Sequence, residues 1–342
     1  MRRPAASGSV QKLYGKGSRK WKPLLFCFPT SGTLIMLPSI LTTLFWSYCL
    51  IPARQSVAQL GENAANFWRL LAGVAVMGLL AGFGRISLDQ NAFTWLFISG
   101  IIGFGFGDIG VWFALPRLGS RLTLLMVHCI AAPLAGLAEW LWLGTAVGAS
   151  QLASLLIILC GISMALIPAH GEEKPAKRRY GSGILFGLLA ATGQSLGAVC
   201  SRKAFSVFDE SGIASVSDYI FLGASSGFAR LTGGILIAGL FWLLSRWHKP
   251  WQSPPDPLRR NDPMTGKIRN VLLCAAAGPI LGVICYQWAL ATTPSIIVQL
   301  IVSTSPLMIL PMSWFIEHDR PSKRSLFGTV VAVLGVVVLV FS

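Results

Sequence analysis

Ten runs of apolar residues divide the chain, and each is apolar all round rather than on one side only. A run of roughly 20 apolar residues can cross the hydrocarbon core of a bilayer as a helix. A helix that is apolar all round faces lipid or a protein interior, not water. The pattern therefore predicts an all-α integral membrane protein with ten transmembrane helices. Their approximate bounds are 28–51, 66–83, 93–115, 120–143, 151–168, 181–203, 218–245, 269–291, 295–316 and 324–342.

Polar segments suggest how the chain is organised. Residues 1–23 are rich in Lys and Arg and are expected to form a disordered tail. The apolar run that follows is too long for the core of a signal peptide, so we expect a spanning helix there. A polar segment at 169–180 separates the first five runs from the last five. The sequence thus predicts a tail, a first five-helix repeat over 24–168, a linker loop over 169–180 and a second repeat over 181–342.

The two halves contain similar segments in the same order. FWRLLAGVAVMGL at 67–79 aligns without a gap with FARLTGGILIAGL at 228–240. Further on, GDIGVWFAL at 107–115 aligns with GVICYQWAL at 282–290. Since five is an odd number, the second half must cross the membrane in the opposite direction to the first. This predicts two inverted five-helix repeats, a plan found in many secondary transporters, with the site at the repeat interface. With a small shift, the alignment also pairs Pro133 with Pro306 and Gly161 with Gly335.

Composition supports a lipid environment for most of the chain. Of its 342 residues, 54% are hydrophobic and 12% are charged, and that charged fraction is about half the value usual in soluble domains. The net charge of +15 comes from Lys and Arg in the tail and in the loops, where basic residues orient membrane helices. Because no module with interleaved aromatic and basic residues is present, we expect no nucleic-acid partner.

Motifs for catalysis or for cofactors are absent from the sequence. No GxxxxGK followed by Ser or Thr occurs, so ATP-driven transport by this chain is not expected. HExxH is absent, and the two stretches that fit GxSxG, GQSLG at 193–197 and GASSG at 223–227, lie within apolar runs rather than at a strand-to-helix turn, so neither indicates a catalytic serine. The seven cysteines lie in or beside apolar runs without a CxxC, and the four histidines are scattered. We therefore expect no metal site and no cofactor.

The last part of the chain carries the features of a known family. Its segment YQWALATTPSIIVQLIVSTSPLMILPMSWFIEHDRPSKRSLFGTVVAVLGVVVL has Pro306 within one helix, Glu317 at the end of that helix, a polar turn and a Gly-rich last helix. This resembles the drug/metabolite transporter superfamily, specifically its EamA type, and the resemblance covers about residues 36–342. The first half departs from the pattern, because the position corresponding to Glu317 is near Gly144 and is not acidic, and Glu139 lies over one turn earlier. The resemblance implies a transporter of small molecules rather than an enzyme.

Asp108 is the strongest candidate for a functional residue. It lies in GFGFGDIGVWF, deep within an apolar run and without a basic neighbour in the sequence. A carboxylate at that depth is costly unless it is paired, protonated or facing a water-filled cavity. We interpret it as a cation-binding or proton-coupling residue. The alternative is a structural ion pair with Arg69 or Arg230 on another helix.

Five further residues are candidates for substrate binding or coupling. Arg69 and Arg230 occupy equivalent repeat positions and are interpreted as binding an anionic group; the alternative is that each snorkels to an interface or pairs with an acid. His128 lies in LLMVHCIAAP and is either a proton relay or a hydrogen-bonded link between helices. Trp112 and Gln287 are also equivalent and either line one cavity or serve in packing.

The remaining polar residues are weaker candidates. Glu139 and Asp218 lie nearer helix ends and are expected at the membrane interface. Glu317 is expected to have a structural role. Four more side chains are polar or amphipathic at mid-helix depth: Gln194, Tyr286, Trp288 and Gln299.

Three functions fit these observations. The leading one is a secondary carrier in the bacterial inner (plasma) membrane, exporting a small metabolite or drug by alternating access between the repeats, with lipid around it and a coupling proton or ion. The runner-up is an intramembrane enzyme or lipid-handling protein that uses Asp108 and His128 as acid and base. The third is a transport-associated subunit without a site of its own. The internal repeat favours the carrier, because a carrier needs two interchangeable halves around one site.

The basic residues give two conflicting signals for orientation. The loops after the odd-numbered helices contain most of the loop Lys and Arg, whereas the opposite loops contain Arg85, Arg202 and Lys203. The positive-inside rule therefore places both termini outside. The basic tail, and the usual cytoplasmic termini of the family that the chain resembles, favour the opposite; a natural start at Met36 would remove the tail from the comparison. We favour the loop signal.

Overall fold

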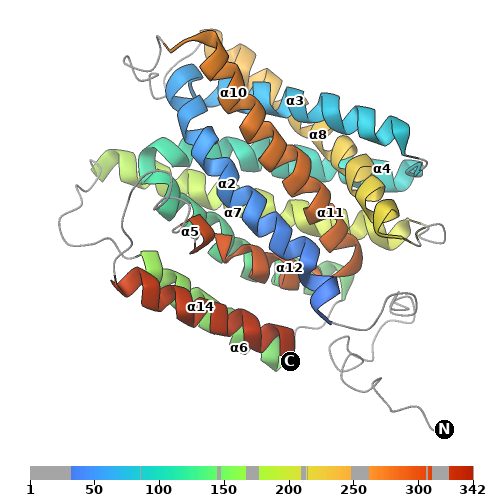
Figure 1. The fold of residues 1–342 in the computed structure, drawn as a ribbon, viewed down its shortest axis with the longest axis vertical. Coiled ribbons are helices and arrows are strands. Elements are labelled where there is room, and N and C mark those ends of the chain that lie inside the picture. Colours follow the sequence, from blue (N-terminus) through green and yellow to red (C-terminus); the bar gives the residue numbers. More distant parts are fainter. Residues whose placement is uncertain are drawn as a thin grey trace.

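Figure 1 shows the computed structural model of the chain, which describes residues 32–84, 86–144, 148–166, 177–208, 213, 215–247, 262–305, 307–309 and 323–341. The described residues form helices joined by short connections and contain no strand, as the apolar runs predict. The predicted tail over 1–23, most of the predicted linker and Glu317 lie outside this part of the chain. The division into a tail, two repeats and a linker stays a prediction.

The helices of the first half are longer than the apolar runs indicated. α2 (Gly32–Leu60) contains Pro38 and Pro52 and continues past residue 51, where its end was predicted. A proline removes one backbone donor, and neighbouring helices in a membrane bundle compensate for that loss. The other elements of this half are α3 (Glu62–Phe83), α4 (Gln90–Gly100), η1 (Ile101–Gly107), α5 (Asp108–Leu143) and α6 (Ala149–Leu166).

Local capping explains two of these boundaries. α4 begins after Asp89, whose carboxylate accepts hydrogen bonds from the backbone N–H groups of Asn91 and Ala92, as an N-cap does. α5 ends at Gly144, which adopts a left-handed φ of 70° that glycine tolerates best. Between these caps, α5 runs through residues 116–119, where a connection between two spans was predicted.

The second half follows the same order of elements. α7 begins at Lys177, so the last residues of the linker predicted over 169–180 are helical. The elements of this half are α7 (Lys177–Val207), α8 (Val216–Trp247), α10 (Met264–Ala275), η2 (Ala276–Gly282), α11 (Val283–Thr292), α12 (Ser295–Val302) and α14 (Lys323–Phe341).

Seven helical segments of the described chain are long and apolar enough to cross a membrane. Two shorter apolar helices lie at Ala149–Gly161 and Ser295–Ile309. The chain is therefore a multi-pass integral membrane protein, and the number of ten helices stays a prediction. The seven segments are Met36–Leu60, Glu62–Phe83, Gln90–Leu118, Met126–Leu143, Gly181–Val207, Val216–Ser245 and Met264–Thr292.

Glycines bring several helix backbones into close contact, as is usual in membrane bundles. α6 and α14 form a pair along one edge of the molecule (Figure 1), where a β-carbon at Gly161 would overlap the backbone of Ala332. α5 packs along α7, where a β-carbon at Gly110 would lie 2.7 Å from the backbone nitrogen of Ala190. α3 packs against α8, which brings the helices of Arg69 and Arg230 side by side.

Two π-helical segments lie at matching places in the two halves. η1 joins α4 to α5, and η2 joins α10 to α11. The sequence alignment of Gly107 with Gly282 pairs these two segments along their whole length. At the end of each, a backbone N–H donates to a carbonyl five residues earlier, from Asp108 to Gly103 and from Val283 to Gly278. Such widened turns inside α-helices occur frequently at functional sites.

Candidate functional site

The first arginine is neutralised inside the bundle. Arg69 of α3 is 6% exposed, and its Nη2 forms an ion pair with the carboxylate of Asp108, the first residue of α5. The same guanidinium donates from Nε and Nη2 to Oδ1 of Asn66, at 3.2 and 3.1 Å. It lies 5.0 Å from the ring centroid of Trp112, within cation–π range. The carboxylate of Asp108 thus neutralises the guanidinium of Arg69, which also packs on the ring of Trp112.

The second arginine has a neutral partner. Arg230 of α8 is 2% exposed, and its Nη1 donates to Oε1 of Gln287 at 2.9 Å. Its guanidinium lies 4.9 Å from the ring centroid of Phe104 and 5.7 Å from that of Tyr286. In the described part of the chain no carboxylate forms an ion pair with it, and neither Nε of Arg230 nor Nε2 of Gln287 has a hydrogen-bond partner. The charge of Asp108 also acts on Arg230, but its carboxylate is paired with Arg69, so one carboxylate serves two buried guanidinium groups.

Each arginine also reaches the π-helical segment of the opposite half. A β-carbon at Gly103 of η1 would lie 3.0 Å from Nη2 of Arg230, and one at Gly278 of η2 would lie 3.2 Å from Nη1 of Arg69. Gly103 and Gly278 are equivalent positions in the alignment of the halves. The absence of a side chain at both positions lets each guanidinium approach the widened turn, so the two arginine groups form one site built from both halves.

Aromatic and amide side chains extend this site toward His128. Tyr286 of α11 accepts a hydrogen bond at 3.3 Å from Nε2 of Gln194, and its ring centroid lies 4.8 Å from that of Trp46 on α2. Trp46 in turn stacks on His128 at 6.2 Å. Nε2 of Gln299 donates to the backbone carbonyl of Gln194 at 3.4 Å. Nδ1 of His128 and Oε1 of Gln299 are buried without a partner among the described residues.

A separate buried network joins the two halves at one end of the bundle. Nε of Arg202 on α7 donates to Oε1 of Glu139 on α5 at 3.3 Å, and Nη1 of Arg202 donates to the carbonyl of Leu290 at 2.6 Å. The other carboxylate oxygen of Glu139 accepts from the backbone N–H of Ser295 at 2.7 Å and from its hydroxyl. Glu139 and Arg202 thereby hold the end of α11 and the start of α12.

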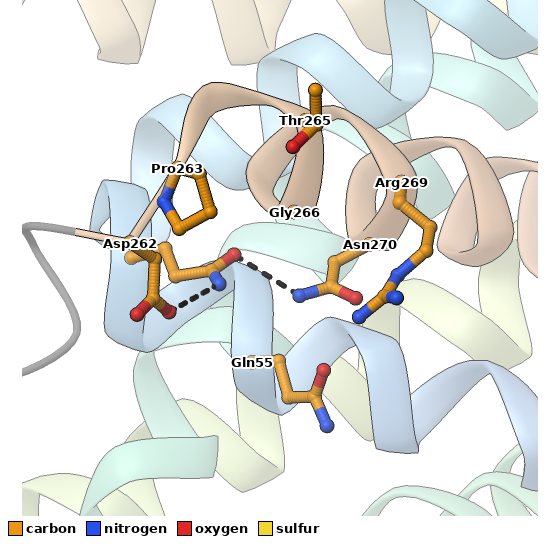
Figure 2. A pocket seen from close by; sticks show the side chains of 8 residues that line it. Gln55, Asp262, Pro263, Thr265, Gly266, Arg269 and Asn270 are labelled. Atoms are coloured by element: carbon orange, nitrogen blue, oxygen red, sulfur yellow. Dashed lines mark hydrogen bonds between the residues drawn. The ribbon is translucent and has the colours of Figure 1, made fainter.

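A polar pocket lies between α2 and α10 (Figure 2). Nε2 of Gln59 donates to Asp262 at 2.8 Å, and Nδ2 of Asn270 donates to Oε1 of Gln59 at 3.1 Å. The pocket has a volume of about 440 Å³ and is half open. Neither Arg69 nor Arg230 lines it, so we interpret it as a contact between the halves rather than as the site. Its lining residues are Gln55, Gln59, Asp262, Pro263, Thr265, Gly266, Arg269 and Asn270.

The structure groups the candidates predicted from the sequence as follows. Arg69, Asp108 and Trp112 are in contact, Arg230 contacts Gln287, and His128 joins them only through Trp46 and Tyr286. Snorkelling of the two arginines to an interface is wrong, because both guanidinium groups are buried beside the glycines of η1 and η2. His128 contacts Trp46 rather than Asp108, so these two residues do not form an acid–base pair.

The end network was missed by sequence reasoning. Glu139 lies near the end of α5 as predicted, where it is 1% exposed and ion-paired with Arg202; its place at the membrane interface stays a prediction. Arg202 was counted only as a loop charge, yet α7 continues to Val207 and leaves Arg202 inside the helix. One signal could have predicted this ion pair: an acidic residue lies within a span of one half and a basic residue lies within a span of the other. Asp218, by contrast, is at the exposed start of α8, where it accepts from the backbone N–H of Ser215 at 2.8 Å.

Metal binding finds no support at this site. Among the residues that the structure describes, no group of three His, Cys, Asp or Glu side chains is arranged to hold an ion. Cys49 and Cys274 lie with their Sγ atoms 3.4 Å apart, between α2 and α10. Two thiols alone do not complete a tetrahedral zinc site.

Comparisons with known proteins agree with this architecture. The model of a family described as "EamA-like transporter family" matches residues 32–167 and again residues 181–341. A solved chain titled only "Crystal structure of protein" superposes with a TM-score of 0.65 and 18% identity, over 90% of this chain and 97% of that chain. At that identity the likeness shows a shared fold alone. No curated protein matches the sequence.

Proposed function

The chain belongs to the EamA-like transporter family, and from this premise we propose that it is a secondary transporter that exports small metabolites or drugs. The observation that carries the proposal is the buried charged site, to which both matched repeats contribute. A carrier requires a site at the interface of its repeats.

Alternating access is the mechanism that the contacts between the halves support. At one end, Glu139 of the first half holds Ser295 of the second; elsewhere, Gln59 of α2 holds Asp262 and Asn270 beside α10. Rocking one half against the other would break one set of contacts while preserving the other. The substrate site would then open to one side of the membrane at a time.

Asp108 is the residue that we assign to coupling. Its carboxylate pairs with Arg69, and a proton or cation that neutralised the carboxylate would release the arginine. Because Arg69 contacts Gly278 of the second half, a change in the pair is transmitted across the repeat interface. Charge on Asp108 is thereby linked to the relative position of the halves.

The proposal includes two inverted five-helix repeats and ten spans in a bacterial inner membrane. The repeat relationship is supported by the alignment of the two halves, in which η1 corresponds to η2 and Arg69 corresponds to Arg230. Membrane lipid and a coupling proton or ion are the partners that this arrangement needs. Reporter fusions after Ser342 that are active only in the cytoplasm test the orientation, with full-length and Met36-start versions compared.

Counterflow in proteoliposomes tests the transporter function. The full-length protein is reconstituted, the vesicles are loaded with one candidate metabolite or drug, and uptake of its labelled form is measured. We expect transient accumulation of at least one compound, and none in vesicles without protein. Absence of counterflow across a broad panel, from a folded and correctly inserted protein, would contradict the proposal.

A further inference from the structure

We propose that Arg230 and Gln287 bind the carboxylate group of the transported molecule, which is therefore a small organic acid. The inference rests on the transporter function proposed above and adds the chemical class of the substrate. It is carried by the charge balance of the site, by its unpartnered donors and by the side chains around them.

Charge balance distinguishes Arg230 from the other buried arginines of α3 and α7. Arg69 pairs with Asp108, and Arg202 pairs with Glu139. Arg230 is almost completely buried and has no ion-paired carboxylate among the described residues, and Asp108, whose charge also acts on it, is already paired with Arg69. A guanidinium removed from water is strongly disfavoured unless an anion lies beside it. A monoanionic ligand at Arg230 would supply that charge, whereas a ligand at Arg69 would first have to displace Asp108.

The unpartnered atoms specify what the ligand must offer. Nε of Arg230 and Nε2 of Gln287 are both buried hydrogen-bond donors without an acceptor. They are held together, because Oε1 of Gln287 already accepts from Nη1 of Arg230. A buried donor without an acceptor is costly, so the site favours a group with two acceptor oxygens. A planar carboxylate accepts from a guanidinium and from an adjacent amide at the same time.

The surrounding side chains describe the rest of the ligand. The rings of Phe104 and Tyr286 lie within cation–π range of the guanidinium, and Trp46 packs on Tyr286. Oε1 of Gln299 is a buried acceptor without a partner. Aromatic walls with a few polar groups are typical of small-molecule sites. They favour an acid with an apolar or aromatic body and one hydrogen-bond donor.

Equilibrium binding to the full-length protein in detergent tests the inference without requiring transport. The probes are phenylacetate, 4-methylpentanoate and phenylalanine, each compared with its primary amide, and phenyl phosphate as an alternative oxyanion. We expect at least one acid to raise the unfolding temperature and to bind about tenfold more tightly than its amide. Equal binding of acids and amides, no binding of any acid, or tighter binding of phenyl phosphate would overturn the inference.

Two variants locate the effect. Arg230→Gln should abolish the preference for acid over amide. Gln287→Glu places an internal carboxylate beside Arg230, as Asp108 is placed beside Arg69. It should raise the unfolding temperature of the ligand-free protein and weaken acid binding about tenfold or more. Gln90→Glu is the matched control for binding, because it makes the same change at the exposed first residue of α4 and should leave acid binding unchanged.

The Gln287→Glu variant keeps the test decisive if Arg230→Gln does not fold. A Gln287→Glu protein that binds acids as tightly as the unmodified protein contradicts the carboxylate site. A Gln287→Glu protein that is less stable contradicts it as well, because it shows that Arg230 does not favour an adjacent anion.

Counterflow measured in parallel separates this inference from the transporter function. Acid binding without counterflow of any compound supports the carboxylate site and contradicts the transporter. Counterflow of a neutral or cationic compound that persists in Arg230→Gln supports the transporter and contradicts the carboxylate site.

Discussion

The two halves of the molecule bury an arginine at equivalent positions but compensate its charge differently. In the first half, Asp108 neutralises Arg69; in the second, the residue aligned with Asp108 is Val283, and Arg230 relies on the neutral Gln287. Both arginines approach a glycine in the π-helical segment of the opposite half. The buried arginine and the glycine that it approaches are thus repeated in both halves, whereas the acidic partner is present in the first half alone.

Under the proposals made above, this difference gives the halves separate tasks. A self-sufficient ion pair holds charge at a fixed place and responds to protonation or to a cation. An uncompensated guanidinium attracts an anion from outside the protein. If both halves had an ion pair, no free guanidinium would be left to bind an anionic substrate. If both halves had an unpaired arginine, the site would contain no carboxylate to bind a proton or a cation.

The largest effect is expected from Asp108→Asn. The substitution leaves Arg69 buried without its counter-ion, and breaking one side of a buried pair costs about 3–5 kcal/mol. We expect uptake driven by a proton or ion gradient to be lost and the unfolding temperature to fall. The double variant Arg69→Gln/Asp108→Asn should recover most of the stability but not the transport. Normal gradient-driven uptake by Asp108→Asn would contradict a coupling role.

Removing the arginines one at a time sharpens the comparison directly. Arg69→Gln strands Asp108 and should destabilise the protein by about 3–5 kcal/mol. Arg230→Gln removes an uncompensated buried charge, so the ligand-free protein should be as stable as the unmodified one or more so. Unfolding in a mild detergent, followed by tryptophan fluorescence, measures both. Equal losses of stability in Arg69→Gln and Arg230→Gln would contradict a difference in charge compensation between the two arginines.

A reversible effect is expected at Cys49 and Cys274, which join the halves beside the Arg69 group. Their Sγ atoms lie 3.4 Å apart, so a membrane-permeant oxidant such as iodine should link them as a disulfide. The link would hold α2 to α10 and block rocking of one half against the other. We expect oxidation to stop counterflow and dithiothreitol to restore it. Cys49→Ser should be insensitive, and a cross-linked protein that still transports would exclude movement at this contact.

The smallest effects are expected from the glycines that face the arginines. Gly103→Ala places a β-carbon 3.0 Å from Arg230, and Gly278→Ala places one 3.2 Å from Arg69 and 2.7 Å from Sγ of Cys49. Overpacking of this kind costs about 1–3 kcal/mol, with the larger loss at Gly278. Gly82→Ala is the control, because a β-carbon there would meet nothing within 4 Å. Unfolding temperatures of the three variants give the order.

Much of the fold was predictable because lipid imposes a simple rule on the sequence. Backbone groups in hydrocarbon must be satisfied within the segment, so long apolar runs become helices. The apolar runs therefore predicted the helices. Comparison of the runs in the two halves then gave the matching segments and the equivalent positions of Arg69 and Arg230. Helix ends were less predictable: α2 passes Pro52 and α7 begins at Lys177, because packing against neighbours outweighs local breakers.

The site was predictable as a set of residues and not as a set of contacts. Asp108 was identified by its depth in an apolar run, because a charged side chain inside a membrane is costly and usually has a partner or a function. The partner was left open between Arg69 and Arg230, since sequence separation does not indicate which helices touch. Glu139 and Arg202 were missed as a pair for the same reason: they lie far apart in the chain and meet only after α5 packs along α7.

The sequence by itself determined that this is a multi-pass helical membrane protein with an internal repeat, because hydrophobic length and similarity of segments are properties of the chain alone. Only the tertiary structure decided which buried charge is compensated. That outcome depends on distances of a few ångströms between helices of both halves. Whether a guanidinium meets Asp108 or Gln287 is a matter of packing, and packing gives Arg69 a carboxylate partner and Arg230 an amide partner.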